Sequence, residues 1–441
     1  MAGTPSLGTV STKQTRIAEL AKQAPTLSFT TLAHHIDIHW LAEAYRRTRR
    51  DGAAGVDGQT GADYAVDLWG NLQRLLDRAK SGTYRAPPVR RVHIPKGTGP
   101  ETRPIGIPTF EDKLLQRAVV MVLESVYEQD FYDCSYGFRP GRSAHQALEA
   151  LWRQLMAMGG GWVVEVDIRK FFDTLDHARL RELLQRRIRD GVLLGLIGKW
   201  LNAGVLEGNV QTTPEQGTPQ GGMISPLLAN VYLHDVLDDW FERDVKPCLA
   251  GAACLIRYAD DFVMVFRHEA DARRVLEVLP KRFAKYALTL HPDKTRLVRF
   301  VRPSQPPGSE AQGPQPGAFD LLGFTHFWGR SRRGGWAVQR QTSSSRLSRA
   351  IKTIAQWCCR HRHLPIAEQH ITLRQKLQGH DAYYGITGNY RMLTRLRQVV
   401  RRVWRKWLAR RRAGPLSWDT FSHLWQRYPL PPARVVHSVY A

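Results

Sequence analysis

Cysteine is scarce in this sequence, and long apolar runs are missing. Five cysteines occur in 441 residues, and the only close pair is the adjacent Cys358 and Cys359, so there is neither a disulfide framework nor the ligand spacing of a zinc site. The most apolar stretch, residues 192–205, is interrupted by Lys199 and Asn202 and is too short to span a bilayer. No signal peptide is recognisable at the N-terminus. We therefore expect a soluble, cytoplasmic protein in a reducing compartment, without a membrane partner.

Acidic residues are few relative to basic ones. The chain has 64 Lys and Arg against 40 Asp and Glu, a formal net charge of +24, and 50 of the basic residues are arginine. From Asp320 to the end, 23 Lys and Arg face four acids, so +19 of the charge lies in the last 122 residues. The guanidinium group binds phosphate oxygens in pairs and stacks on bases. The C-terminal part is therefore expected to bind nucleic acid, in preference to forming only a solvated basic surface.

Length and composition predict a globular protein of several domains. With 43% hydrophobic and 24% charged residues, the chain is neither disordered throughout nor collagen-like. The first 30 residues are rich in Ser, Thr and Ala, and we expect them to be partly mobile. Residues 302–318 contain five prolines among Gly, Ser and Gln and read as a linker or as a surface insertion.

Hydrophobic periodicity predicts helices alternating with short strands. Helices are expected over 38–49, 64–80, 114–127 and 175–189. Two strands, 89–96 and 102–108, flank a Gly-Thr-Gly-Pro turn and form a finger with Lys96 and Arg103 near its tip. Further strands are expected over 162–168, 254–258 and 262–266. Only Ala259, Asp260 and Asp261 separate the last two strands, which predicts a hairpin with carboxylates at its turn.

Acidic residues at these strand ends can face each other across one sheet. Asp167 ends one strand, and Asp260 and Asp261 lie at the hairpin turn. Mg²⁺ prefers oxygen ligands, so aspartates and a backbone carbonyl can hold two ions about 4 Å apart. Such a pair activates an attacking hydroxyl and neutralises a leaving pyrophosphate. Taken alone, an Asp-Asp pair between strands is an ordinary polar turn, so the surrounding sequence decides the assignment.

The surrounding sequence contains a set of ordered motifs. Residues 216–230 read QGTPQGGMISPLLAN, and Tyr258-Ala259-Asp260-Asp261 follows 28 residues later. RPIGIP at 103–108 and YGFRPGRS at 136–143 lie upstream, and Tyr-Tyr-Gly at 383–385 lies downstream. In this order the motifs resemble the reverse transcriptases, specifically the reverse transcriptase/maturase proteins of group II introns, over about residues 30–441.

The resemblance implies an α+β right-hand polymerase, with fingers, a palm built on an antiparallel sheet, and a helical thumb. The expected parts are an N-terminal extension and fingers at 31–160, the palm at 161–301, a primer-grip region at 319–342 and a basic thumb/maturase domain at 343–441. In this family the thumb also binds intron RNA.

The resemblance also implies roles for the carboxylates and their neighbours. Asp167, Asp260 and Asp261 look like the catalytic residues, and with the carbonyl of Ile168 they look like the ligands of two Mg²⁺ ions, for which Mn²⁺ is an expected substitute. The residues that resemble nucleotide-binding positions are Lys96, Arg103, Phe172, Gln220 and Lys294. Phe172 resembles the aromatic that excludes a 2′-hydroxyl and so selects dNTPs. Apart from the resemblance, Lys96 and Arg103 read as exposed charges and Phe172 as a core residue.

Nucleic-acid contacts are expected at two further places. The residues that resemble primer and template contacts are Gly323, Phe324, Arg139 and Arg142. Ten Lys and Arg occur between Arg391 and Arg412, interleaved with apolar residues at helical spacing, which predicts a helix with one buried face and one cationic face. The RNA-binding candidates on it are Arg395, Arg401, Arg402, Arg405, Lys406, Arg410, Arg411 and Arg412. Trp404 and Trp407 on the same helix are expected in the core.

The expected function is an RNA-directed DNA polymerase that extends a DNA 3′-hydroxyl on an RNA template. It would also bind group II intron RNA to assist splicing and mobility, and would be nucleoid-associated when acting on DNA. Many relatives carry a C-terminal HNH endonuclease domain, whereas this sequence ends at Ala441 without one, so we expect priming from a nascent strand or by another nuclease. Two alternatives stay open. One is a domesticated polymerase in DNA repair or phage defence, and the other is an RNA-binding splicing factor without polymerase activity.

Overall fold

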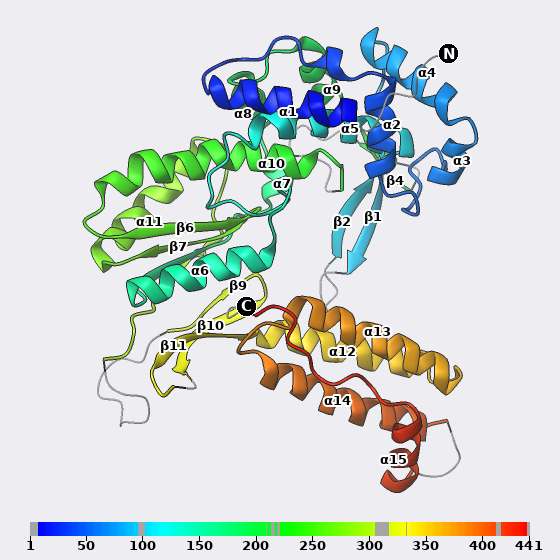
Figure 1. The fold of residues 1–441 in the computed structure, drawn as a ribbon, viewed down its shortest axis with the longest axis vertical. Helices are drawn as coiled ribbons and strands as arrows, with labels where there is room; N and C mark the ends of the chain where they lie inside the picture. The colour runs from blue at the N-terminus through cyan, green and yellow to red at the C-terminus, as the bar shows by residue number, and fades with distance from the viewer. Residues whose placement is uncertain are drawn as a thin grey trace.

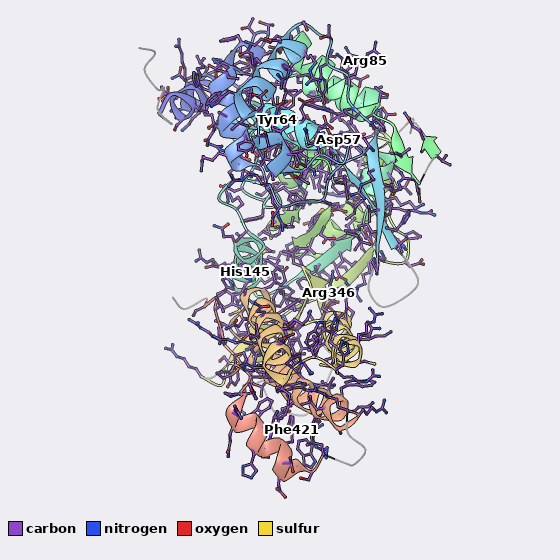
Figure 2. The ribbon with its side chains drawn as sticks, turned by 90° about the vertical axis from the view of Figure 1, so that its right-hand side faces the viewer. Asp57, Tyr64, Arg85, His145, Arg346 and Phe421 are labelled. Carbon is purple, nitrogen blue, oxygen red and sulfur yellow. The ribbon has the colours of Figure 1, made fainter. Side chains whose placement is uncertain are left out.

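The computed structural model describes residues 8–95, 102–208, 210–212, 217, 221–304, 317–331, 333–411 and 416–438. Three parts follow one another along the longest axis of the molecule (Figures 1 and 2). A helical N-terminal part with a two-stranded finger lies at one end, a central four-stranded sheet lies in the middle, and the last four helices lie at the other end. In the described part of the chain no helix has the length and apolar character needed to cross a bilayer.

The N-terminal part packs around the buried helix α5 (Phe110–Tyr127). The other elements are α1 (Gly8–Gln23), η1 (Ala33–His35), α2 (Ile38–Arg47), α3 (Gly61–Ala65), α4 (Leu68–Lys80), α8 (His177–Gln185) and α9 (Gly191–Leu201). The N-terminus differs from the expectation of a mobile segment, because α1 packs on α5 and buries Ile17 and Ala21. The single helix expected over 64–80 is divided between α3 and α4. The Asp67 side chain caps the start of α4 by accepting a hydrogen bond from the Gly70 N–H.

A small sheet forms the finger with the strand order β2-β1-β4-β5. Its strands are β1 (Val89–Pro95), β2 (Thr102–Ile107), β4 (Val205–Glu207) and β5 (Val210–Thr212). The β1–β2 pair is antiparallel, as the sequence predicts, and pairs Ile94 with Arg103 near its tip. The β1–β4 pairing is parallel and joins the finger to a segment more than a hundred residues downstream. The finger is therefore braced by chain that lies between strands β3 (Trp162–Val166) and β6 (Ala253–Tyr258).

The central sheet has the antiparallel order β6-β7-β3-β8. Its strands are β3 (Trp162–Val166), β6 (Ala253–Tyr258), β7 (Asp261–Phe266) and β8 (Arg296–Arg299). The helical elements around it are α6 (Ala144–Met158), α7 (Phe171–Thr174), α10 (Ser225–Leu233), π-helical η2 (His234–Asp239) and η3 (Phe241–Val245), η4 (Lys246–Cys248) and α11 (Glu269–Ala284). Alternate strand residues enter different cores, Val164 with α10 and α11, and Val163 with α6. Helices therefore cover both faces of the sheet (Figure 1).

A separate hydrophobic core holds the last helices together. A three-stranded sheet of β9 (Phe319–Leu321), β10 (Phe324–Arg330) and β11 (Trp336–Thr342) leads into α12 (Ser344–Arg360), α13 (Ile366–Tyr384), α14 (Tyr390–Ala409) and α15 (Trp418–Arg427). Their core includes Leu373, Leu377, Val400, Trp404 and Phe421, so Trp404 is a core residue, as the sequence predicts. Residues 305–316 of the expected linker lie outside the described residues.

The final described segment returns from α15 to the central part (Figure 1). His437 forms a parallel bridge with Ile386 at the end of α13, and its ring stacks on His145 of α6 with 3.6 Å between centroids. His437 Nε2 also lies 2.8 Å from the carbonyl oxygen of Ala382. We call residues 430–438 the C-terminal strap, because they connect the base of α13 to the helix that covers the central sheet.

Candidate active site

Strand register brings the predicted catalytic carboxylates to one edge of the central sheet. β3 and β7 pair antiparallel with Val166 opposite Phe262, so one step further along the register Asp167 comes opposite Asp261. In the neighbouring pair Tyr258 lies opposite Asp261, which leaves Ala259 and Asp260 as the hairpin turn. Asp261 is therefore the first residue of β7, where the sequence had placed it in the turn. Asp167 and the Asp260-Asp261 pair, which are more than 90 residues apart in sequence, thus meet at the same sheet edge.

The carboxylates interact with one another electrostatically. Partial burial and the charge of Asp167 raise the pKa of Asp260, opposed by a backbone hydrogen bond. Loss of hydration and the charges of Asp260 and Asp167 raise the pKa of Asp261 to about 6. Like charges that are held together in this way favour a bound cation or a proton. The sheet edge therefore has the electrostatic character of a cation site.

One cation at this site comes from the protein itself. Lys294 Nζ lies 2.5 Å from Asp167 Oδ2, and the Lys294 side chain remains more than half exposed. The strand-end position of Asp167 is fixed by its carbonyl, which accepts a hydrogen bond from the His291 N–H at 2.8 Å. Ile168, the predicted carbonyl ligand, has a buried side chain and bridges Leu290. In the described ranges no three His, Cys, Asp or Glu side chains are grouped closely enough to hold a metal ion.

Two arginines from distant segments direct positive charge at the carboxylates. Arg103 of β2, which the sequence predicts near this site, opposes the rise in the pKa values of Asp260 and Asp261. Arg346, near the start of α12, also lowers the pKa of Asp261 and lies between the central sheet and the last helices in Figure 2. Arg346 carries no sequence signal, because it lies in the first turn of α12 after a run of serines, and only the tertiary fold brings it to this site.

The remaining nucleotide-binding predictions lie around a glycine-rich segment. Phe172 of α7 is half-buried and packs edge-on against Phe171 with 5.3 Å between centroids. A Cβ at Gly217 would lie 2.7 Å from the Phe172 carbonyl oxygen, and a Cβ at Gly221 would lie 2.4 Å from the Gly106 carbonyl oxygen on β2. The backbone of the glycine-rich segment therefore lies directly against the backbone of α7 at Gly217 and against the backbone of β2 at Gly221. Lys96 and Gln220 lie outside the described residues.

The predicted primer contacts at 323–324 form a tight turn between β9 and β10. Leu322 and Gly323 both have positive φ, 52° and 80°, and the Leu322 carbonyl accepts a hydrogen bond of 2.8 Å from the Tyr383 hydroxyl. The Phe324 side chain is fully buried and packs against Tyr383 and Tyr384. Phe324 therefore steadies the turn from inside, and only backbone is left for a direct contact with a primer.

The YGFRPGRS motif lies behind the catalytic hairpin. Arg139 is buried, and its guanidinium donates to Glu128 at 3.0–3.2 Å and to the carbonyls of Tyr132 and Ser135 at 2.7 and 2.8 Å. The sequence-based assignment of Arg139 to primer or template is corrected, because these internal acceptors occupy the side chain. Arg142 is half-exposed and pairs with Asp133 at 2.5 Å.

The basic helix α14 shows two environments for its arginines. The exposed candidates are Arg395, Arg402, Lys406, Arg410 and Arg411. The half-buried candidates stack on tryptophan rings, Arg405 at 4.0 Å from the Trp418 centroid and Arg401 at 5.0 Å from the Trp425 centroid. Arg412 lies outside the described residues. Among the described residues, the outer face of α14 therefore presents cations that pair with no acid, and the helix has the buried face and the cationic face that the sequence predicts.

Comparison with known proteins identifies the family. Residues 94–326 match the family model described as reverse transcriptase (RNA-dependent DNA polymerase). Protein YkfC of Escherichia coli K12 is 35% identical over 332 residues, which cover 65% of this chain and 84% of that protein. Group II intron-encoded protein LtrA of Lactococcus lactis is 47% identical over 301 residues. Nuclear intron maturase 2 of Arabidopsis thaliana is 28% identical over 233 residues, covering 44% of this chain.

The matched lengths differ between these relatives. The aligned region is 65% of this chain in each of the two bacterial comparisons, but only 49% of LtrA. The chain therefore spans about half the length of that relative. The family match includes Asp167, Asp260 and Asp261, and it extends from the finger to strand β10. The chain belongs to the reverse transcriptase family of RNA-directed DNA polymerases and is related to the group II intron-encoded proteins.

Proposed function

We propose that this chain extends a DNA 3′-hydroxyl with dNTPs on an RNA template, using Asp167, Asp260 and Asp261. The observation that carries the proposal is the strand register, in which Asp167 comes opposite Asp261 and beside Asp260. No structural need explains three acids at one sheet edge, since their mutual repulsion opposes folding at neutral pH. Phosphoryl transfer needs such a site, because charge on the phosphates must be neutralised.

The chemistry of the donor set suits a divalent cation, although Lys294 holds Asp167 and the three carboxylates are not gathered around a single point. Reverse transcriptase domains use divalent metal ions, and carboxylate oxygens are the ligands that Mg²⁺ and Mn²⁺ prefer. The raised pKa values of Asp260 and Asp261 and the ammonium group on Asp167 both indicate that the cluster needs positive charge. The three aspartates, with the Ile168 carbonyl, would hold two Mg²⁺ ions. A bound ion would supply Lewis acidity to the attacking hydroxyl and to the leaving phosphates.

The protein's own cations would bind the triphosphate. Arg103 from the finger and Lys294 from the opposite side both direct charge at the aspartates, so an incoming triphosphate would meet positive charge on two sides. When a metal cation binds the aspartates, the Lys294 ammonium group would leave Asp167 and pair with the phosphates of the nucleotide. Lys96 and Gln220 are assigned to the same nucleotide site, and Phe172 to exclusion of the 2′-hydroxyl.

The thumb is proposed to bind duplex and structured RNA. The exposed cations of α14 have no acidic partner in the contacts of the described chain, and phosphate groups are the natural anions for such a face. Two relatives carry names that refer to introns. On that basis we assign group II intron RNA as the RNA partner, with assistance to splicing as the second role of the protein.

The test of the polymerase assignment is primer extension on an RNA template with dNTPs and Mg²⁺. Asp260→Ala and Asp261→Ala are expected to lower the rate by at least about 10³-fold, because the charge stabilisation of the transition state is lost. Asp244→Ala is the matched control, since Asp244 is an exposed aspartate of the same palm. Wild-type synthesis by the Asp260→Ala, Asp261→Ala double variant would refute the assignment.

Sugar selection is tested with the same assay. Phe172→Ala is expected to increase incorporation of rNTPs relative to dNTPs, because a smaller side chain leaves room for a 2′-hydroxyl. Phe171→Leu is the control, because Phe171, the first residue of α7, is buried in the core and packs on Tyr232. An unchanged ratio of rNTP to dNTP incorporation in Phe172→Ala would remove Phe172 from the nucleotide site.

A further inference from the structure

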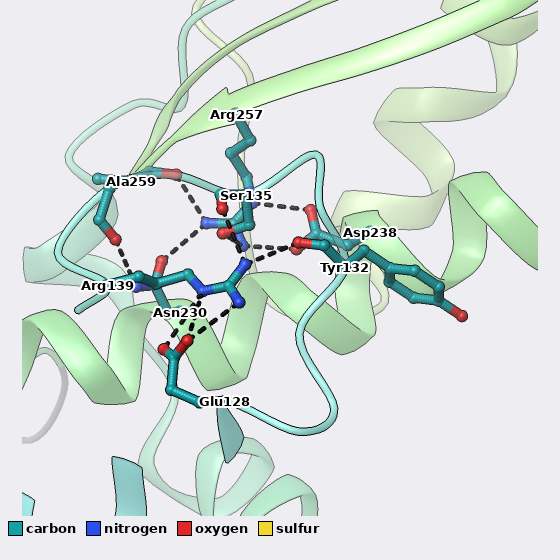
Figure 3. A network of polar contacts seen from close by, with 9 residues as sticks. Glu128, Tyr132, Ser135, Arg139, Asn230, Asp238, Arg257 and Ala259 are labelled. Carbon is teal, nitrogen blue, oxygen red and sulfur yellow. Dashed lines mark hydrogen bonds and ion pairs between the residues drawn. The ribbon is translucent and has the colours of Figure 1, made fainter. Parts of the chain in front are cut away.

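A fully buried arginine lies directly behind the catalytic hairpin. Arg257 of β6 has no exposed surface, and neither does its ion-pair partner Asp238 in η2. Figure 3 shows the polar contacts that converge on the Arg257 guanidinium from three separate segments of the chain. Burial of an ion pair costs desolvation that the pairing alone does not always recover. The contacts of Arg257 indicate a role beyond stability.

The guanidinium of Arg257 donates five hydrogen bonds, which equals the number of N–H donors that an arginine has. Nε and Nη2 bond the two carboxylate oxygens of Asp238 at 2.7 and 2.5 Å, and Nη1 bonds Asn230 Oδ1 at 2.9 Å. Nη2 also bonds Ser135 Oγ at 2.7 Å, and Nη1 bonds the Ala259 carbonyl at 3.1 Å. Four of the bonds fix the guanidinium, and the fifth holds the peptide that precedes Asp260.

That peptide is in an unusual conformation. Ala259 has a φ of 57°, a left-handed conformation that costs a side-chain-bearing residue energy and that hairpin turns usually assign to glycine. Such a conformation persists only where the surroundings determine it. The bond from Arg257 to the Ala259 carbonyl is one such restraint, and it acts one residue before the catalytic carboxylate.

A second restraint comes from the YGFRPGRS motif. A Cβ at Gly137 would lie 2.3 Å from the Ala259 nitrogen, so the backbone at Gly137 lies directly against the turn. Asn230, which binds Arg257, also donates to the Gly137 carbonyl at 2.7 Å. Arg139 holds the same loop from the other side through Glu128 (Figure 3). The turn is therefore enclosed between the motif backbone and the Arg257 guanidinium.

We propose that Arg257, anchored by Asp238 and Asn230, is a positioning residue that fixes the Ala259 peptide and so places the Asp260 carboxylate for divalent metal binding. This inference rests on the proposed polymerase function. It also gives the YGFRPGRS motif a task other than contact with nucleic acid, since the backbone at Gly137 forms the second wall of the turn. Residues that orient a metal ligand typically affect metal affinity when they are changed.

The test compares two variants that disturb the turn in different ways. Arg257→Lys keeps the charge but loses the planar fork that reaches Asp238 and Ala259 together. Gly137→Ala leaves the buried ion pair intact and pushes on the Ala259 nitrogen. The control is Arg187→Lys, because Arg187 is also a buried arginine, paired with Asp130 at 2.8 Å and bonded to three carbonyls, but in the N-terminal part of the molecule.

Three quantities are measured on each protein bound to an RNA template and DNA primer. They are the thermal unfolding midpoint, the Mg²⁺ concentration that gives half-maximal primer extension, and Mn²⁺ binding followed by electron paramagnetic resonance. Both turn variants are expected to weaken Mn²⁺ binding and to raise the half-maximal Mg²⁺ concentration by about 10- to 100-fold. Arg187→Lys is expected to lower the unfolding midpoint while leaving both metal readouts unchanged.

Each outcome decides between the hypotheses. If Arg257→Lys does not fold, Gly137→Ala carries the test alone, because it retains the ion pair. The positioning role would be overturned if the folded turn variants bound Mn²⁺ and responded to Mg²⁺ as Arg187→Lys does. Arg257 would then be a stabilising residue only. If Asp260→Ala is inactive at the same time, the polymerase assignment stands. Full activity of Asp260→Ala would instead remove the proposed function on which the inference rests.

Discussion

Arg257 in the palm and the arginines of α14 in the thumb show two uses of the same side chain. Arg257 is completely buried, and protein acceptors take all five of its N–H donors. Arg395 and Arg402 instead face solvent, and Arg405 lies over the ring of Trp418. The difference follows from the acids within reach. The last 122 residues contain only four acids, and among the described ones Asp381 is occupied by Arg397.

The comparison teaches that arginine content alone does not locate a nucleic-acid surface. An arginine that finds an internal carboxylate becomes part of the fold, as Arg257, Arg139 and Arg187 do. An arginine without one keeps its capacity for an external phosphate. The thumb is therefore the surface whose charge remains available, and the following changes test the distinction in decreasing order of effect.

Removal of the acid from the buried pair should have the largest effect on stability. Asp238→Ala leaves the Arg257 guanidinium buried without its counter-charge and is expected to cost about 3–5 kcal/mol of unfolding free energy. In the thumb, Arg402→Ala removes an exposed charge and is expected to change stability by no more than about 0.5 kcal/mol. Urea denaturation of both variants measures the contrast. Equal costs would show that the two arginines are not used differently.

A buried acid that has no arginine partner should make the unfolding free energy depend on pH. Asp112 is 1% exposed, and its acceptor oxygens bind Trp200 Nε1 at 2.7 Å, Gln116 Nε2 at 3.1 Å and the Tyr84 hydroxyl. Burial raises the pKa of Asp112 from 3.8 to about 6. The native state therefore binds the proton more tightly than the unfolded state, and ionisation destabilises the fold as pH rises from 4 to 6 by up to about 3 kcal/mol.

The measurement is the difference in unfolding free energy between wild type and Asp112→Asn at pH 4 and at pH 7. Because asparagine does not ionise, the variant is expected to gain about 2–3 kcal/mol relative to wild type between these two values. Asp244→Asn, at an exposed position, is expected to show no such change. A pH-independent difference for Asp112→Asn would contradict a raised pKa at this position.

Neutralisation of the exposed thumb face should weaken RNA binding. The triple variant Arg395→Gln, Arg402→Gln, Lys406→Gln is expected to lower affinity for structured RNA and to reduce the slope of log K against log salt by about 2 to 3, since each lost phosphate contact contributes about 0.7–0.9. The matched control removes three exposed arginines that are paired with acids, Arg153, Arg179 and Arg273. Equal losses of RNA affinity in the two triple variants would show that the exposed cations of the thumb bind RNA no better than other exposed arginines.

A small effect on stability is expected where an arginine of α14 stacks on tryptophan. Arg405→Lys keeps the charge but loses the flat contact 4.0 Å from the Trp418 ring centroid, so unfolding free energy is expected to fall by about 0.5–1 kcal/mol. A double-mutant cycle with Trp418→Leu isolates that contact. A coupling energy of zero would show that Arg405 is held by α14 alone.

The order of motifs predicted that three aspartates lie at one sheet edge, which the strand register confirms, while their catalytic role stays a prediction. Strand periodicity and the YADD hairpin placed Asp167, Asp260 and Asp261 together, because adjacent antiparallel strands fix which residues are neighbours. The helix α1 was missed, although its buried residues Val10, Ile17 and Ala21 recur at helical spacing, because the segment as a whole is poor in large apolar residues.

Side-chain direction was the part that the sequence could not supply. Arg139 looked like a nucleic-acid contact, but Glu128 and two carbonyls hold it inside the protein. Phe324 looked like a primer contact, but it lies in a core formed with residues some 60 positions later. Arg257 and Arg346 were overlooked for the same reason, since their partners come from distant segments. Where a motif residue points depends on tertiary packing that spacing does not encode.

The C-terminal strap has a mechanical consequence for the thumb. Its hydrogen bonds to Gly385 and the stacked rings of His145 and His437 lie where α13 meets the palm, so the strap crosses the pivot on which the thumb helices would swing. Wide opening would have to separate those rings and peel the strap from Gly385. The angular range over which the thumb can adapt to a helix of given width is thus limited by a tether that is anchored at His145 and Gly385.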